Sequence, residues 1–208
     1  EIWVAAHGPR MLGITGRYGD GWIPSAPPLD GPTGYERSWA TIQTAAEETG
    51  RLPESITPSL FAYVLMAPTS TQVEELLRAK LVKYTALMST SAEWWEERGY
   101  DHPFGRGFRG YVDVLPEAID GRALSAAISR VPPEIVRSSC LYGTPRQVEA
   151  AIRDYADAGL RHIVLAPGSA QIKSRYRNYV LWALPRLVRS LRRKRPHLSG
   201  IKGRPTPL

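Results

Sequence analysis

Short apolar runs alternate with segments of helical periodicity along most of this chain. The runs at 2–6, 21–25 and 162–166 have the length of buried strands, and 57–66 is a longer, β-rich fourth. Between them, apolar residues recur at helical spacing and are followed by Gly or Pro. The expected helices cover 9–18, 35–49, 70–88, 91–98, 124–131, 145–158 and 176–193, with a further short one starting at Pro132.

Capping signals support several of these boundaries. Thr144-Pro145-Arg146-Gln147 is a capping box with Pro at the first helical position. Ser70 or Thr71 is the expected cap of the helix 70–88, and Pro185 predicts a kink in the last helix. Residues 99–121 are rich in Gly, Pro and aromatic side chains without a clear period, which predicts a long loop. Strands that alternate with helices in this way indicate an α/β fold with a parallel sheet.

Composition limits the class of protein. A chain of 208 residues with 43% hydrophobic residues is expected to form one globular domain. No apolar run is long enough to span a bilayer, and no signal peptide opens the sequence. The lone Cys140 cannot form an internal disulfide, which favours a cytoplasmic location.

The positive charge is concentrated at one end of the chain. Residues 186–208 carry eight basic side chains and no acid, whereas the other 185 residues carry 19 basic and 20 acidic ones. One interpretation is an arm for nucleic acid or anionic lipid, and the other is a solvated, disordered tail at 194–208. Nucleic acid is disfavoured, because no aromatic residue lies within the basic run to stack on bases.

The start of the chain has the features of an anion site. The strand 2–6 ends in the small residues Ala5 and Ala6, and Gly8 and Pro9 then open a helix. Small residues let an anion approach the backbone, and the free N–H groups and dipole of a helix N-terminus favour negative charge.

Two motifs give the chain a family resemblance. Ala5-Ala6-His7-Gly8-Pro9-Arg10-Met11-Leu12 is followed by Gly19-Asp20-Gly21-Trp22, and Gly143-Thr144-Pro145 by Ala158-Gly159-Leu160 and the strand 162–166. This order resembles the luciferase-like flavin and deazaflavin oxidoreductases, a family of (β/α)8 barrels, over roughly residues 1–190. The residues of the first motif are most similar to those of the deazaflavin-using branch, which includes methylene-tetrahydromethanopterin reductase and ketoreductases.

The resemblance implies that the chain is the carboxyl-terminal half of a barrel. Residues 1–193 would supply the fifth to eighth strands with outer helices, and 67–143 an insertion of helices and loop that covers the substrate side. The first four strands have no counterpart, so we expect exposed sheet edges, a poor catalyst in isolation, and a need for the other half or for a second copy. A self-standing doubly wound sheet is the alternative fold.

The resemblance also implies a cofactor and its site. The phosphate of coenzyme F420, or alternatively of FMN, would lie against Ala6, His7 and Gly8, with Pro9 and Arg10 beside them. The implied activity is hydride transfer between a deazaflavin and a small organic substrate. Alternatives are an FMN-dependent monooxygenase and, in another class, a non-catalytic half-barrel that binds partners through its basic tail.

The remaining candidates line the expected substrate pocket. Ser25 lies at the carboxyl end of its strand, where barrel sites lie, and Trp22 and His102 are further pocket candidates. Asp20 lies at the amino end of the same strand and is expected to bond local backbone N–H groups. The His and Cys residues are too scattered for a metal site, so no metal is expected.

Overall fold

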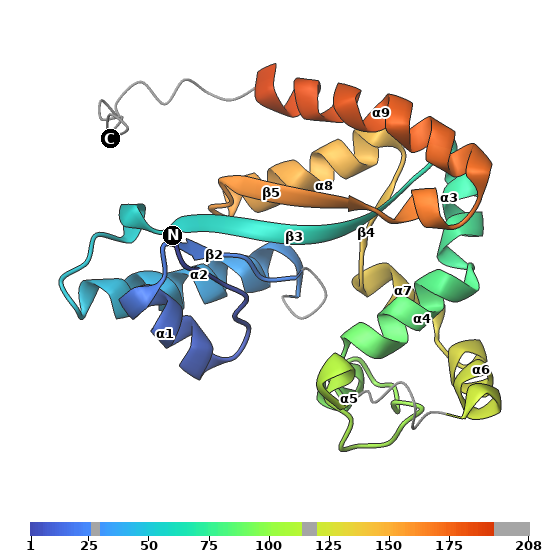
Figure 1. The fold of residues 1–208 in the computed structure, drawn as a ribbon, viewed down its shortest axis with the longest axis horizontal. Helices are drawn as coiled ribbons and strands as arrows, with labels where there is room; N and C mark the ends of the chain where they lie inside the picture. Colours follow the sequence, from blue (N-terminus) through green and yellow to red (C-terminus); the bar gives the residue numbers. More distant parts are fainter. Residues whose placement is uncertain (26–29, 114–119, 194–208) are drawn as a thin grey trace.

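The computed structural model describes residues 1–25, 30–113 and 120–193 (Figure 1). The tail 194–208, predicted to be disordered, lies outside these residues, as does part of the predicted loop 99–121. Among the described residues, no helix combines the length and the apolar composition needed to cross a membrane.

Every strand pairing in the sheet is parallel, as the alternation of strands and helices predicts. The strands are β1 (Trp3–Val4), β2 (Gly21–Trp22), β3 (Thr57–Met66), β4 (Leu141–Gly143) and β5 (His162–Pro167). The first two are shorter than predicted, although an isolated bridge from Ser25 to Phe61 continues the contact of the β2 segment with β3. The sequence analysis missed β4, which is only three residues long.

The ten-residue strand β3 is the centre of the sheet. Its first residues pair with β2, its middle pairs with β5, and its last three residues pair with β4. The alternating residues Leu60, Ala62 and Val64 are buried in the main hydrophobic core. On the opposite face Phe61 is 42% exposed. This exposed face is the side that a closed barrel would turn inward.

Four helices cover the buried face of the sheet: α1 (Pro9–Tyr18), α2 (Gly31–Glu47), α8 (Pro145–Asp157) and α9 (Ser174–Arg193). Helix α2 begins four residues earlier than predicted, because Pro32 fits the first helical turn. Helices α1 and α2 cross at Gly16, where a Cβ atom would lie 2.4 Å from the Ile42 carbonyl oxygen. Arg51 donates hydrogen bonds of 2.9 and 2.8 Å to the Gly16 and Gly19 carbonyls and so satisfies the carboxyl end of α1.

The middle of the chain packs around a second core beyond the carboxyl end of β3 (Figure 1). Its helices are α3 (Ser70–Leu77), α4 (Lys80–Ser89), α5 (Ala92–Glu96), α6 (Gly121–Ser129) and α7 (Pro133–Ser138), which we call the helical lobe. The prediction of one helix over 70–88 was wrong, because Ala79 adopts an extended conformation and separates α3 from α4. The cap of α3 is Thr69, one residue before the predicted candidates.

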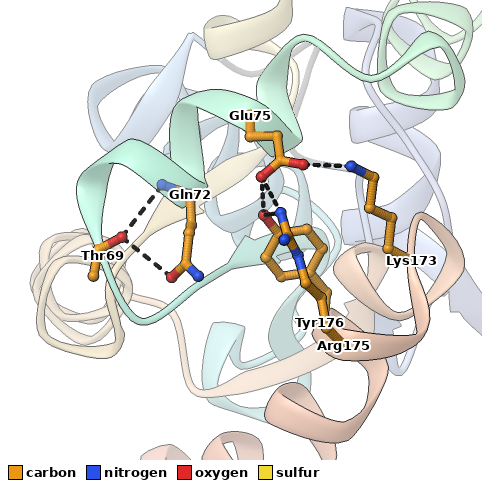
Figure 2. A network of polar contacts seen from close by, with 6 residues as sticks. All are labelled: Thr69, Gln72, Glu75, Lys173, Arg175 and Tyr176. Carbon is orange, nitrogen blue, oxygen red and sulfur yellow. Dashed lines mark hydrogen bonds and ion pairs between the residues drawn. The ribbon is translucent and has the colours of Figure 1, made fainter.

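A polar network joins α3 of the helical lobe to the start of α9 (Figure 2). The Glu75 carboxylate accepts hydrogen bonds from Lys173 at 2.5 Å, from the Tyr176 hydroxyl at 2.6 Å, and from Arg175. The hydrogen bonds from Lys173 and Tyr176 are the main causes that lower the pKa of Glu75 to about 2. The charged form of Glu75 therefore holds the lobe against the last helix.

This network predicts a specific acid sensitivity. A carboxyl whose pKa is lowered on folding stabilises the fold above its unfolded pKa, and this stability is lost as the pH falls through the folded value. For Glu75 the window runs from about 4.5 down to about 2. Glu75→Gln should lower the free energy of unfolding at neutral pH. The variant's free energy of unfolding should also decrease less than that of the wild type as the pH falls through this window. Urea denaturation at a series of pH values measures both effects.

Glu36→Gln is the matched control, since Glu36 is exposed on α2 and forms no ion pair within the described part of the chain. Superimposable pH profiles for the wild type and Glu75→Gln would show that the network does not stabilise the fold.

Candidate functional site

The carboxyl ends of β1 and β2 bring His7 and Ser25 together. The His7 Nε2 atom lies 3.4 Å from the Ser25 backbone nitrogen and 3.3 Å from its hydroxyl oxygen. Neighbouring parallel strands place their following residues at the same edge of the sheet, and barrel enzymes carry out their chemistry at this edge. The structure therefore brings together two residues that the sequence predicts to lie beside the cofactor and in the substrate pocket.

The N-terminus of α1 opens at the same place. Gly8 is the N-cap in an extended conformation without a side-chain cap, and Pro9 occupies the first turn. The first intrahelical bond runs from the Leu12 N–H to the Gly8 carbonyl, so the amides of Arg10 and Met11 precede it. No acidic residue lies in this turn, and a Cβ built on Gly8 meets no atom within 4 Å.

Ala6 and Trp22 hold the backbone that leads into this turn. Ala6 is buried, and its carbonyl accepts a 2.9 Å hydrogen bond from the Trp22 indole. The Trp22 ring is fully buried against Tyr35 and Trp39 of α2, with ring centroids 4.7 and 6.3 Å away. Because this indole packs against the helices, we assign Trp22 to positioning the turn and leave it out of the proposed pocket.

The His7 imidazole has one nitrogen without a partner. Burial lowers the pKa of His7, which favours the neutral ring at neutral pH. If Nε2 accepts the Ser25 N–H, the ring proton lies on Nδ1. This Nδ1 atom is buried and has no hydrogen-bond partner among the described residues. In this tautomer the ring keeps one neutral N–H donor that no group within the described residues accepts.

His102 lies in the helical lobe, where both of its ring nitrogens have hydrogen-bond partners. Its Nε2 atom is 3.1 Å from the Leu87 carbonyl, and its Nδ1 atom accepts the Phe104 N–H at 3.2 Å. The ring stacks on Phe108 and meets the edge of Trp95. Burial lowers its pKa. These contacts fit a packing residue, and we leave His102 out of the proposed pocket.

Asp20 bonds backbone groups, but they belong to the start of β1 and not to the local turn that the sequence predicts. Its carboxylate accepts the Ile2 N–H at 2.7 Å, and its own N–H donates to the Ile2 carbonyl. These bonds tie the start of β1 to the turn before β2.

The structure also contains a cavity that the sequence analysis missed. It has a volume of about 370 Å³ and lies between the start of α2, α8 and the helical lobe. Arg98 and Arg137 line it, but Arg98 is paired with Asp30 and stacked on Trp94, and Arg137 is paired with Glu74. Burial raises the pKa of Cys140 there to about 12, so the thiol stays protonated. No short motif joins these distant positions, so the sequence offered no signal.

The residues at the start of α1 fit a phosphate group. They provide the Arg10 and Met11 amides, which precede the first helical hydrogen bond, the exposed Arg10 side chain, open space at Gly8, and the His7 Nδ1 atom, which has no partner among the described residues. Within 1–25, 30–113 and 120–193, no group of His, Cys, Asp and Glu residues is arranged to hold a metal ion.

Comparison with known sequences identifies close relatives. Residues 1–162 match the family model described as luciferase-like monooxygenase. The chain is 36% identical over 195 residues to a phthiodiolone/phenolphthiodiolone dimycocerosates ketoreductase of Mycobacterium kansasii. The aligned region covers 93% of this chain and 52% of the relative. The ketoreductase of Mycobacterium tuberculosis is 39% identical over 169 residues, covering 81% and 44% respectively. The chain thus spans about half the length of these relatives.

Solved structures share the fold at low sequence identity. A coenzyme F420-dependent tetrahydromethanopterin reductase from Methanopyrus kandleri is 22% identical with a TM-score of 0.58, covering 79% of this chain and 44% of that one. An F420-dependent secondary alcohol dehydrogenase is 15% identical with a TM-score of 0.60, covering 91% and 48%. A long-chain alkane monooxygenase is 16% identical with a TM-score of 0.55, covering 97% and 43%. Because the family model matches residues 1–162, which are most of this chain, the chain belongs to the luciferase-like monooxygenase family.

Proposed function

We propose that this chain forms the phosphate-binding half of an oxidoreductase that transfers hydride between coenzyme F420 and the carbonyl group of an organic substrate. The observations that carry the proposal are the open N-terminus of α1 and the His7 residue directly before it in the chain, whose Nδ1 atom has no partner among the described residues. Curated relatives named as ketoreductases support carbonyl reduction, and neighbours of similar fold that use F420 support the cofactor.

Each residue of the turn has a role in holding the cofactor. The amides of Arg10 and Met11 and the Arg10 guanidinium would bind the phosphate, and the neutral His7 ring would donate one further hydrogen bond without adding charge. Ala6 and Trp22 fix the backbone beneath them. The deazaflavin itself supplies the hydride, and this chain's contribution is to orient and bind the cofactor.

Ser25 and the helical lobe are the proposed substrate side. Ser25 lies beside His7 at the end of the β2 segment, and the lobe follows the carboxyl end of β3. Both positions are on the edge of the sheet where barrel loops form the pocket. We propose that residues 67–143 cover the substrate there.

Two other functions remain alternatives. An FMN-dependent monooxygenase would use the same phosphate site, and the similarity in fold to a long-chain alkane monooxygenase favours testing it. A non-catalytic half-barrel would keep the fold and bind no cofactor. The three functions differ in cofactor binding and in the use of oxygen.

A chimera separates these functions. The chain covers 52% of the Mycobacterium kansasii relative, and the resemblance implies that the rest includes the first four barrel strands. This part of the relative is fused in front of Glu1, and light scattering and circular dichroism verify folding. The expected result is that the fusion oxidises reduced coenzyme F420 in the presence of a ketone, whereas the isolated chain turns over far more slowly because it lacks half of the pocket wall. A folded fusion that consumes oxygen with reduced FMN and ignores F420 would instead support the monooxygenase. No turnover with either cofactor would support the non-catalytic alternative.

A substitution at Gly8 tests the phosphate site directly. Gly8→Asp places a carboxylate where the phosphate is expected, and like charges a few ångströms apart near a protein surface repel by a few kcal/mol. The affinity of the fusion for coenzyme F420 should fall by about ten- to a hundredfold. Fluorescence titration of the cofactor measures this change.

Gly8→Asn is the matched control, since its side chain has the same size and no charge. Both residues are good helix N-caps and the space above Gly8 is open, so both variants should melt at or above the wild-type temperature. Equal affinity of the Asp and Asn variants would place the phosphate elsewhere.

A further inference from the structure

The outward face of α9 combines exposed apolar side chains with positive charge. This helix buries Tyr176, Val180, Ala183 and Leu187. On the other side Leu181 is 68% exposed and Trp182 is 54% exposed. Figure 1 shows α9 along the outer edge of the molecule, with β5 and α8 on its inner side. Large apolar side chains on such a face are available to a partner.

The charge on this face is of one sign. Residues 174–193 contain six arginines and no acid. Arg175 pairs with Glu75, but no ion pair involves the other five among the described residues: Arg177, Arg186, Arg189, Arg192 and Arg193. The sequence beyond the helix adds Lys194, Arg195, Lys202 and Arg204, again without an acid. The face is therefore complementary to a surface rich in anions.

The geometry of Trp182 favours a lipid surface over a nucleic acid. The Arg186 guanidinium lies 3.7 Å from the centroid of the Trp182 ring, so one face of the indole is already covered. Single-stranded nucleic acids are bound by several aromatic rings on which successive bases stack, whereas Trp182 is the one aromatic side chain of α9 that is more than half exposed. Trp beside Arg is instead typical of a membrane interface, where the indole lies at the headgroup level and the guanidinium meets phosphate.

We propose that the face formed by Leu181, Trp182 and the five unpaired arginines docks onto an anionic lipid surface. The arginines would bind lipid phosphates, and the two apolar side chains would enter the headgroup region. A basic residue near an anionic membrane contributes about 1 kcal/mol, which is about fivefold in affinity. This proposal does not depend on the identity of the cofactor.

Sedimentation with lipid vesicles tests the proposal. The protein should bind vesicles of phosphatidylcholine mixed with phosphatidylglycerol, bind pure phosphatidylcholine far less, and dissociate as salt is added. Arg189→Gln/Arg192→Gln should weaken binding by about 25-fold, from two contributions of about fivefold each. Trp182→Ser should weaken binding without changing the charge. Quenching of tryptophan fluorescence by brominated lipids should fall in Trp182→Phe.

Arg122→Gln/Arg130→Gln is the control with the same change in charge, because both arginines are exposed on or next to α6, which lies far from α9 (Figure 1). Equal weakening by the control pair would show that only net charge matters and would overturn the proposal. Equal binding to both vesicle types would also contradict it. Tighter binding to a DNA oligonucleotide than to the mixed vesicles at the same salt concentration would assign the face to nucleic acid instead.

Discussion

The parallel pairing of β3 with three other strands is the constraint on which the rest of this structure depends. A parallel sheet places all carboxyl ends of its strands at one edge. The turn after β1, Ser25 and the helical lobe all follow strand ends, and they therefore lie toward the same side of the sheet. The buried face of β3 requires the outer helices, and the contact between His7 and Ser25 requires the adjacency of β1 and β2.

The parts of the fold that follow from local pattern could be predicted from the sequence. The strands over 57–66 and 162–166 are long enough for a clear pattern, and Pro9 and the capping box at Thr144 mark helix starts. The missed features depend on distant contacts. Strand β4 has only three residues, and the break at Ala79 contains neither Gly nor Pro.

The same distinction applies to the site. The small residues and the Gly-Pro step identified the turn at residues 6–10, because their backbone requirements are local. The direction of Trp22 is set by its packing on α2, and the His7 ring is positioned by Ser25 after β2; no local pattern reveals either contact. The cavity beside Arg98 and Arg137 joins segments far apart in the sequence and was likewise beyond prediction.

The central claim is that an anion binds at the amino end of α1, and NMR tests it most directly. The chain is labelled with nitrogen-15 and titrated with inorganic phosphate and then with coenzyme F420. The account predicts that the Arg10 and Met11 amides and the His7 Nδ1 resonance shift together and saturate with both ligands. Shifts confined to residues around Arg98 and Arg137, with Arg10 and Met11 unchanged, would contradict it.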